Sequence, residues 1–333
     1  MNSRMAALLF SCMLVSSVVG CEKKEPAQKD ERPTIAVIPK GTIHEFWKSV
    51  HAGSIKASRE LDVEIIWKAP LKEDDREAQI AVMEDMIVRG VSGIVLTPLD
   101  DTALRMPVVN AKRAGIPVVI TDSGLKGKDF VSYVATDNFE AGRTAARYMG
   151  KLLDGKGKVA VLRYSEGHDS TTKREDGFLK GIAEFEGIEV VSSDQYAGVT
   201  TESAVKAAEN LFLRFGGGAG KVEIGGIFCA TEPTTLGILR ALENVDAAGK
   251  IKFVGFDTSD MMVNALRKGR LHGFVVQNPI KIGYLGVKTM VQHLRGEKVE
   301  TRIDTGATLV TPENIDNPEI KEVTAPDLSE WLD

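Results

Sequence analysis

Four side chains able to contact a ligand stand where a predicted strand meets a predicted helix. The stretch TIAVIPKGTIHEFWKSVHAG, residues 34–53, begins with alternating β-branched residues, as a buried strand would, and continues as a helical segment. Lys40, His44, Phe46 and Trp47 fall within eight positions at this junction. Charged and imidazole groups form hydrogen bonds with polar atoms of a ligand, and aromatic rings pack against the face of a ligand ring or carbon chain. The pattern indicates a binding surface at the end of this strand.

Ten short runs rich in Val and Ile follow Pro33 and alternate with helical stretches. Most runs lack polar alternation, which is typical of strands buried on both faces of a parallel sheet. Two of the helical stretches, 75–90 and 138–155, end in a glycine suited to a helix C-cap. The alternation predicts a doubly wound α/β architecture. The strands are expected at 34–39, 63–67, 93–97, 117–121, 131–136, 158–164, 188–193, 225–229, 252–256 and 272–277.

The alternation repeats before and after about Asp137, which predicts two similar lobes. A length of 333 residues, about twice that of a typical domain, agrees with this. Two such lobes leave a cleft lined by the carboxyl ends of strands, where these sheets bind ligands. The net charge of −5 and the absence of a basic cluster argue against a nucleic-acid partner.

The N-terminus has the pattern of an export signal. Arg4 precedes an apolar segment too short to span a bilayer comfortably, and the segment ends in Val-Val-Gly-Cys at Cys21. This ending resembles a bacterial lipobox, in which the cysteine is lipid-modified and becomes the new N-terminus. The alternative is an ordinary secretory signal with an incidental cysteine. We expect a signal peptide at 1–20, a flexible tether at 21–33, and an exported periplasmic lipoprotein anchored to a membrane.

Six sequence motifs follow one another along the chain: IPVVITDS, YVATDNFEAGRTAA, KREDGFLKGI, LGILRAL, FVGFDTSD and VVQNPIKIGYLGV. In order and spacing they resemble the periplasmic sugar-binding proteins of the ribose-binding type, which are relatives of the lactose-repressor ligand domain. The resemblance covers residues 34–314. It implies the type I periplasmic binding protein fold, with two lobes joined by a hinge that the chain crosses three times, near Asp137, at Gln277–Pro279 and near Gly306. The implied lobes are 34–137 with 278–306, and 138–277 with 307–333.

The resemblance also implies ligand contacts at several strand ends. Asp122, Asp257 and Gln277 match partners of ligand hydroxyls, and Arg174 matches an arginine that reaches from the second lobe. Phe46 and Trp47 stand in place of a clamping aromatic pair. Other readings remain open: Asp122 and Asp257 as turn or cap residues, Arg174 in a surface ion pair with Glu175 or Asp176, and Trp47 in the core.

The chain departs from the ribose binders at several of these positions. Lys40 replaces a small polar residue, His44 an asparagine, and Ser123 a second arginine. Thr231 or Glu232 occupies the region of a cleft asparagine. The Lys40 and Asp122 pair looks like the autoinducer-binding branch, whose lysine and aspartate hold a furanose-like polyol. The expected ligand class is therefore a sugar, a polyol or a sugar derivative.

The function implied is that of a monomeric, non-enzymatic solute-binding protein that delivers its ligand to an ABC transporter permease after hinge closure. The alternative is a receptor that signals the ligand to a membrane sensor. A catalytic role lacks a sequence basis, since no cofactor fingerprint or nucleophile elbow is present. The glycine-rich stretch 215–222 lacks the first glycine and the Ser or Thr of a phosphate loop, and His168 has no partners at metal-ligand spacing. We expect no cofactor and no metal.

Overall fold

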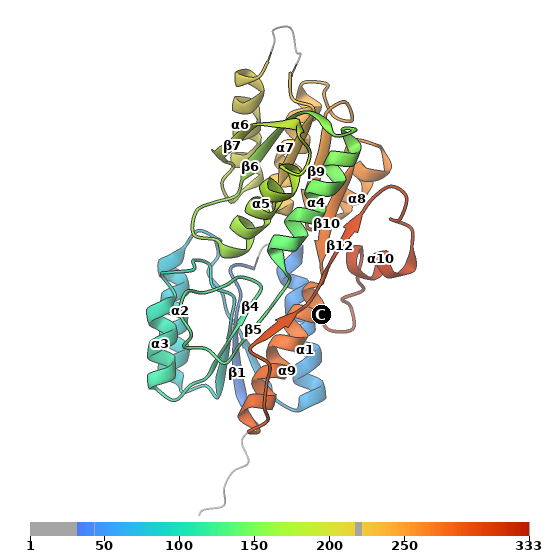
Figure 1. The fold of residues 1–333 in the computed structure, drawn as a ribbon. Coiled ribbons are helices and arrows are strands. Elements are labelled where there is room, and N and C mark those ends of the chain that lie inside the picture. The colour runs from blue at the N-terminus through green and yellow to red at the C-terminus, as the bar shows by residue number, and fades with distance from the viewer. Residues whose placement is uncertain (1–31, 43, 217–221, 333) are drawn as a thin grey trace, which may run out of the picture. The chain divides into compact units, whose positions relative to one another are not determined.

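Two six-stranded sheets organise the residues that the computed structural model describes, namely 32–42, 44–216 and 222–332 (Figure 1). The first sheet has the order β11-β5-β4-β3-β1-β2 with parallel pairings. The second has the order β12-β10-β9-β8-β6-β7, and its edge strand β12 is antiparallel to β10. The strands are β1 (Thr34–Ile38), β2 (Glu64–Trp67), β3 (Gly93–Leu96), β4 (Val118–Thr121), β5 (Ser132–Ala135), β6 (Lys156–Arg163), β7 (Gly187–Tyr196), β8 (Gly226–Cys229), β9 (Lys252–Phe256), β10 (Gly273–Gln277), β11 (Arg302–Asp304) and β12 (Ala307–Val310).

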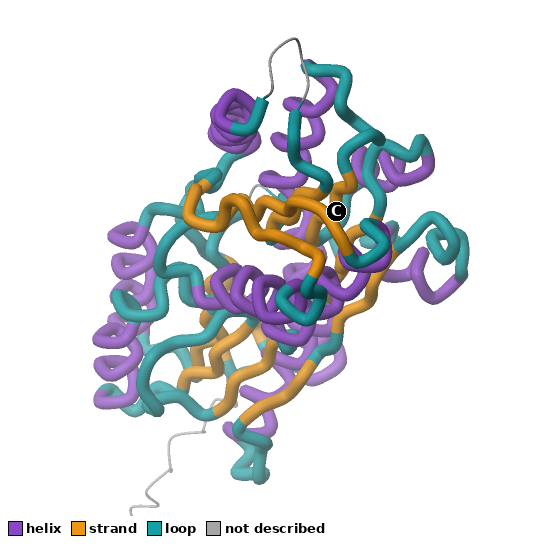
Figure 2. Tube along the Cα trace, turned by 45° about the horizontal axis from the view of Figure 1, so that its top comes forward, coloured by secondary structure: helices purple, strands orange, loops and turns teal. Residues whose placement is uncertain are grey.

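Helices cover both faces of each sheet, as the tube in Figure 2 shows in purple around the orange strands. The predicted architecture of two α/β lobes is confirmed, and all ten predicted strands are present. β11 and β12 were not predicted. The helices are α1 (Glu45–Leu61), α2 (Arg76–Arg89), α3 (Arg105–Arg113), α4 (Asn138–Leu152), α5 (Asp169–Ile182), α6 (Thr201–Arg214), α7 (Glu232–Asn244), α8 (Asp260–Arg267), α9 (Pro279–Leu294) and α10 (Pro318–Thr324).

The unbroken Val and Ile runs are explained by burial on both sides of the sheets. In β1, Ala36 and Ile38 belong to the core under α2 and α3, whereas Ile35 and Val37 belong to the core under α1 and α9. Successive strand side chains point to opposite faces, so each face needs its own apolar set. A fully buried Val or Ile contributes about 1.5–3 kcal/mol, so these strands hold the carboxyl ends in fixed positions.

One of the two predicted helix ends is corrected. α2 ends as expected, with Gly90 as a left-handed C-cap at φ 66°. α4 instead ends at Leu152 with Leu153 as its C-cap, and Gly155 lies beyond it at φ 71°. The left-handed turn after α4 includes Asp154 at φ 50°, a residue type that tolerates this conformation.

Glycines bring two helix pairs into backbone contact. A Cβ on Gly142 of α4 would overlap the carbonyl oxygen of Arg174 in α5, and one on Gly53 of α1 would overlap that of Ile280 in α9. Only glycine permits such close approach, so α4 and α5 are fixed together. This packing sets the position of Arg174 relative to the second sheet.

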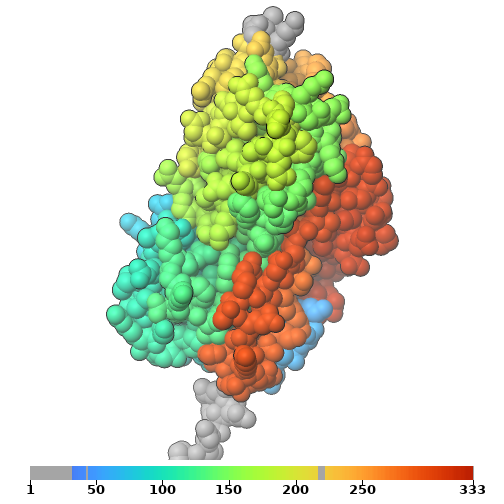
Figure 3. Space-filling model, in the orientation of Figure 1, coloured from blue at the N-terminus to red at the C-terminus, as the bar shows by residue number. Residues whose placement is uncertain are grey.

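The chain passes between the two sheets three times, after β5, after β10 and between β11 and β12, close to the positions expected from the sequence. The division into lobes 34–137 with 278–306 and 138–277 with 307–333 remains a proposal. The end of the chain does not fit it, because Trp331 lies beneath Lys56 and Arg59 of α1, at 5.5 and 5.4 Å, in the first lobe. Figure 3 shows the C-terminal residues, in red, at the surface.

The predicted signal peptide (1–20), most of the tether (21–33) and the lipid site Cys21 lie outside the described residues. Across the described part of the chain, no helix has the length and apolar character needed to cross a membrane.

Candidate ligand-binding site

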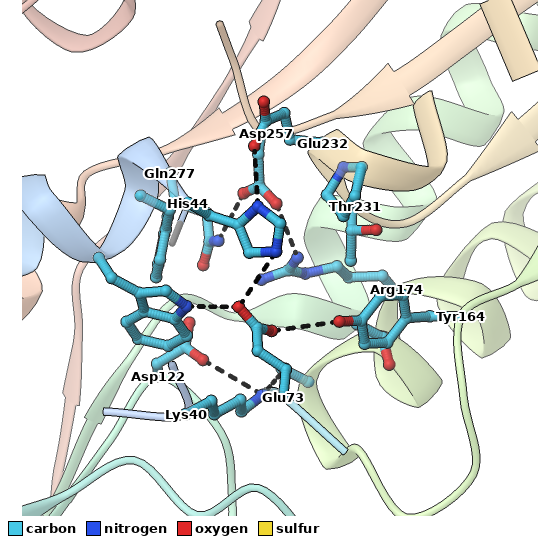
Figure 4. A pocket seen from close by; sticks show the side chains of 15 residues that line it. Lys40, His44, Glu73, Asp122, Tyr164, Arg174, Thr231, Glu232, Asp257 and Gln277 are labelled. Carbon is cyan, nitrogen blue, oxygen red and sulfur yellow. Dashed lines mark hydrogen bonds and ion pairs between the residues drawn. The ribbon is translucent and has the colours of Figure 1, made fainter. Parts of the chain in front are cut away.

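A cavity of about 440 Å³ lies where carboxyl ends of strands from both sheets meet (Figure 4). It contains ten of the eleven side chains that the sequence singled out for ligand contact. Five further lining residues were not predicted: Glu73, Tyr164, Ser170, Thr171 and Pro233. The predicted ones are Lys40, His44, Phe46, Trp47, Asp122, Arg174, Thr231, Glu232, Asp257 and Gln277.

Ser123 is the predicted residue that does not line the cavity. Its side chain is fully buried, and its Oγ accepts a hydrogen bond of 3.2 Å from the backbone N–H of Ser170. Ser170 in turn contacts Lys40. Ser123 therefore supports the wall of the cavity from behind.

Lys40 follows β1 and is almost completely buried, at 4% exposure. Its Nζ lies 3.5 Å from Asp122 Oδ2 and donates to Ser170 Oγ at 3.1 Å. A buried ammonium needs such partners, because desolvation without them costs several kcal/mol. The structure thus places Lys40 beside Asp122, the residue with which it is paired in the resemblance to the autoinducer-binding branch.

Arg174 is buried in α5, so the surface ion pair with Glu175 or Asp176 is excluded. Its Nε donates to Asn138 Oδ1 at 2.7 Å, and its Nη1 donates to the carbonyl of Ala230 at 2.9 Å. Nη1 also lies 3.6 Å from Asp257 Oδ2. The guanidinium is stacked 4.0 Å over the Phe256 ring. These contacts fix the cation against the cavity.

Asp122 and Asp257 occupy equivalent places in the two sheets. Asp122 follows β4 with φ 57°, and Asp257 follows β9 with φ 62°. The left-handed conformation is one that Asp tolerates, and it turns each carboxylate out of the strand direction into the cavity. Each faces a buried cation, Lys40 for Asp122 and Arg174 for Asp257. The two lobes thus supply matching ion pairs.

Gln277 is the last residue of β10 and forms a hydrogen bond with Asp257. Its Nε2 donates to Asp257 Oδ1 at 2.8 Å. Burial raises the pKa of Asp257, while the charge of Arg174 and the hydrogen bond from Gln277 oppose that rise. The side chain of Gln277 is 2% exposed. Its remaining oxygen is free to accept a hydrogen bond from a ligand.

The aromatic pair lies at the start of α1. Phe46 and Trp47 pack edge to face with ring centroids 4.8 Å apart. Trp47 is 3% exposed and also lines the cavity, so it belongs to both the core and the site. Its Nε1 donates to Glu73 Oε1 at 2.6 Å, which fixes the ring orientation.

Glu73 links the two lobes at the site. It accepts from Trp47 in the first lobe and from the Tyr164 hydroxyl, after β6 in the second, at 3.1 Å (Figure 4). Tyr164 is the last residue of the predicted strand 158–164, so searching the strand ends for polar or aromatic side chains could have identified it. Glu73 lies in the irregular segment between β2 and α2, and no sequence pattern distinguishes it there.

His44 and Glu232 form a second cross-lobe contact. His44 Nδ1 lies 3.7 Å from Glu232 Oε2, and its Nε2 lies 3.5 Å from Glu73 Oε1. Burial, followed by the charges of Asp257, Glu45 and Glu73, raises the pKa of Glu232 to about 7. Glu232 therefore changes its charge near neutral pH.

The raised pKa of Glu232 predicts a pH-dependent stability. Its ordinary value is 4.5, so between about pH 4.5 and 7 the folded state binds more protons than the unfolded state, and stability falls as the pH rises through this window. Replacing Glu232 with Gln should make the fall smaller. Urea unfolding at about pH 5 and pH 8 measures it. Glu175, whose pKa burial raises to about 7, keeps its own contribution in the variant. If the free energy of unfolding falls equally in the wild type and the variant, Glu232 is not the group responsible.

Three buried acceptor atoms at the cavity have no hydrogen-bond partner within the described chain: Asp122 Oδ1, Glu232 Oε2 and Gln277 Oε1. Buried polar groups left without partners cost about 1–3 kcal/mol each. A molecule that donates several hydrogen bonds at once would satisfy them.

The described residues show no catalytic or metal-binding arrangement around the remaining candidate groups, His168 and Cys229. His168 is buried, and burial lowers its pKa to about 2, so it is neutral. Cys229 is a buried thiol whose pKa burial raises to about 12. Among the described residues, no group of three or more His, Cys, Asp or Glu side chains could hold a metal. Most of the glycine-rich stretch 215–222 lies outside them.

The chain is similar to known proteins over most of its length. Residues 35–298 match the family described as periplasmic binding protein domain. The ribose import binding protein RbsB of Haemophilus influenzae is 29% identical over 278 residues, which are 84% of this chain and 91% of that protein. The D-allose-binding periplasmic protein of Escherichia coli is 28% identical over 272 residues, 79% of this chain and 85% of that protein.

Solved structures resemble this one closely. A carbohydrate transporter solute binding protein from Agrobacterium radiobacter, in complex with D-arabinose, has a TM-score of 0.82 and 31% sequence identity. The match covers 88% of this chain and 98% of that one.

Proposed function

The chain belongs to the periplasmic binding protein family, and from this premise we propose that it captures a neutral sugar or polyol and delivers it to an ABC transporter permease. The resemblance to ribose-type sugar-binding proteins seen in the sequence is confirmed. The family places its members in the periplasm and consists of sugar-binding transport proteins. That this chain catalyses no reaction stays a prediction.

The three unpartnered acceptors carry this proposal. Asp122 Oδ1, Glu232 Oε2 and Gln277 Oε1 face one cavity from both lobes. Ligand hydroxyls would donate to them and accept from Lys40 and Arg174. Phe46 and Trp47 would cover the C–H face of the ring. A polyhydroxy compound is the ligand class that uses all of these groups.

The charge of the cavity supports a neutral ligand. Lys40 and Arg174 are its cations, and Glu73, Asp122, Glu232 and Asp257 are its carboxylates. Two cations against four carboxylates repel an anion, even when Glu232 is protonated. The cations already face carboxylates of the protein, so their role toward the ligand is to donate to hydroxyls.

Contacts between the lobes support capture by hinge closure. Lys40 and Ser123 of the first lobe both bond Ser170 of the second. The backbone N–H of Gly124 donates to Asp169 Oδ2 at 2.9 Å. Closure with a ligand in place would align the same strand ends around it, and a permease would then meet both lobes in one arrangement.

Calorimetric titration tests the proposed function. The probes are D-ribose, D-allose, D-arabinose, D-xylose, D-glucose and D-galactose. An amino acid and a dicarboxylate, titrated separately, serve as non-sugar comparisons. The proposal expects at least one neutral sugar to bind with a Kd of about 1 μM or tighter. Binding of the amino acid or the dicarboxylate, with no binding of any sugar, would contradict it.

We further propose that Cys21 carries a lipid anchor, on the lipobox resemblance of the sequence. Replacing Cys21 with Ser removes the thiol to which the lipid would attach, so the exported protein should move from the membrane fraction to the soluble fraction. Fractionation of cells that express each form measures this. Cys229→Ser is the matched control and should leave the distribution unchanged. A Cys21→Ser protein that stays fully membrane-bound would contradict lipidation.

A further inference from the structure

A second cavity of about 1360 Å³ adjoins the first. This volume includes space open to solvent, and it exceeds the 440 Å³ of the first cavity. Residues from both lobes line both cavities. The shared residues are His44, Phe46, Glu232, Asp257 and Gln277. Figure 4 shows His44, Glu232, Asp257 and Gln277 grouped on one side of the first cavity.

Where the second cavity adjoins the first, its lining is polar and acidic. Glu232 Oε2, Gln277 Oε1 and Thr258 Oγ1 are buried atoms without partners, and all three residues line it. Gln277 is 2% exposed, so its free oxygen has no access to bulk water. Glu45 and Asp260 add carboxylates, and no Lys or Arg is among the lining residues. The lining thus suits a group that donates hydrogen bonds and is not negatively charged.

The opposite wall comes from the end of the chain. Val323, Pro326 and Leu328 line the cavity with apolar surface. This segment is held at both ends: Ile320 of α10 is buried in the core of the second lobe, and Arg59 Nη1 of α1 donates to the Glu330 carbonyl at 2.9 Å. These residues lie beyond residue 298, where the match to the family model ends.

We propose that the second cavity is a subsite for a further sugar unit, so that the ligand is a disaccharide or a glycoside larger than a monosaccharide. This inference rests on the proposed function. The first cavity is the smaller of the two, and its lining suits one polyhydroxy ring, as argued above. The linkage passes the shared residues Phe46 and Gln277, and the second unit hydrogen-bonds Thr258 Oγ1 and the carboxylates of Glu45 and Asp260. The apolar wall covers its carbon face.

The test compares each monosaccharide with disaccharides that contain it. The probes are D-glucose with cellobiose and maltose, D-galactose with lactose and melibiose, and D-xylose with xylobiose, all titrated by calorimetry. We expect one disaccharide to bind about tenfold more tightly than its constituent monosaccharides. Met261→Trp places a large ring in the second cavity, which Met261 lines without lining the first. It should weaken that disaccharide about tenfold and affect the monosaccharide much less.

Leu213→Trp, on the exposed face of α6 and away from both cavities, is the matched control and should change neither affinity. If monosaccharides bind more tightly than every disaccharide, or if Met261→Trp weakens both classes equally, the subsite is refuted while the proposed function stands. If no sugar of either class binds, the proposed function fails as well.

Discussion

Replacing Arg174 with Met is expected to lower the free energy of unfolding by about 3–5 kcal/mol and to abolish measurable sugar binding. The guanidinium is 3% exposed and contacts Asn138, Ala230 and Asp257. Its removal leaves the Asp257 carboxylate buried without a cation. An unpaired buried charge destabilises the folded state strongly, because its desolvation is no longer offset by a partner. It also removes a hydrogen-bond donor from the cavity. Urea unfolding and calorimetric titration measure the two effects.

Arg163→Met is the control that separates the two effects. Arg163 pairs with the buried Glu175 at 3.0 Å but does not line the cavity. This variant should also lose stability, yet it should bind the same sugar with unchanged affinity at a temperature where it is folded. An Arg174→Met protein that loses less than about 1 kcal/mol, or that still binds normally, would contradict the assigned role.

Replacing Lys40 with Met is expected to weaken binding of a neutral sugar by about 1.5–3 kcal/mol, or roughly 10- to 150-fold. In the proposed complex the ammonium donates to a ligand hydroxyl, and it lies 3.5 Å from Asp122 Oδ2. Titration of D-glucose against D-glucuronic acid, and of D-galactose against D-galacturonic acid, measures the charge preference. The neutral member of each pair should bind more tightly to the wild type.

Lys48→Met is the matched control for charge, because Lys48 is exposed on α1 and pairs with Glu45. It should leave both affinities within about twofold. If only the acidic sugars bind, and if Lys40→Met abolishes that binding, the conclusion that the ligand is neutral is wrong.

Much of the fold was predictable because burial on both sheet faces produces unbroken Val and Ile runs. β11 and β12 escaped prediction because they are short edge strands whose residues are largely exposed, so their composition carries no such signal. The C-terminal segment 325–332 likewise has no periodic pattern. Its position depends on Trp331 meeting Lys56 and Arg59, a long-range contact that local sequence does not encode.

The candidate site was predictable where a polar side chain stands at or just after the end of a strand, as in Lys40, Asp122, Asp257 and Gln277. Ser123 also follows a strand end. The left-handed turn at Asp122 sends the Asp side chain into the cavity and the next one behind it. Glu73 could not be found this way, because it reaches the site from a loop. Its role depends on Trp47 and Tyr164, which come together only in the folded chain.

The most direct test of the central claim is to identify the small molecule that the protein carries when purified from cells without denaturation. The protein is denatured, the released compound is separated, and its mass and quantity are determined by mass spectrometry. Our account predicts a neutral polyhydroxy compound in about one-to-one ratio with the protein, and its rebinding to the refolded wild type but not to Arg174→Met. Release of an amino acid, a peptide or an organic anion that rebinds equally to both proteins would contradict it.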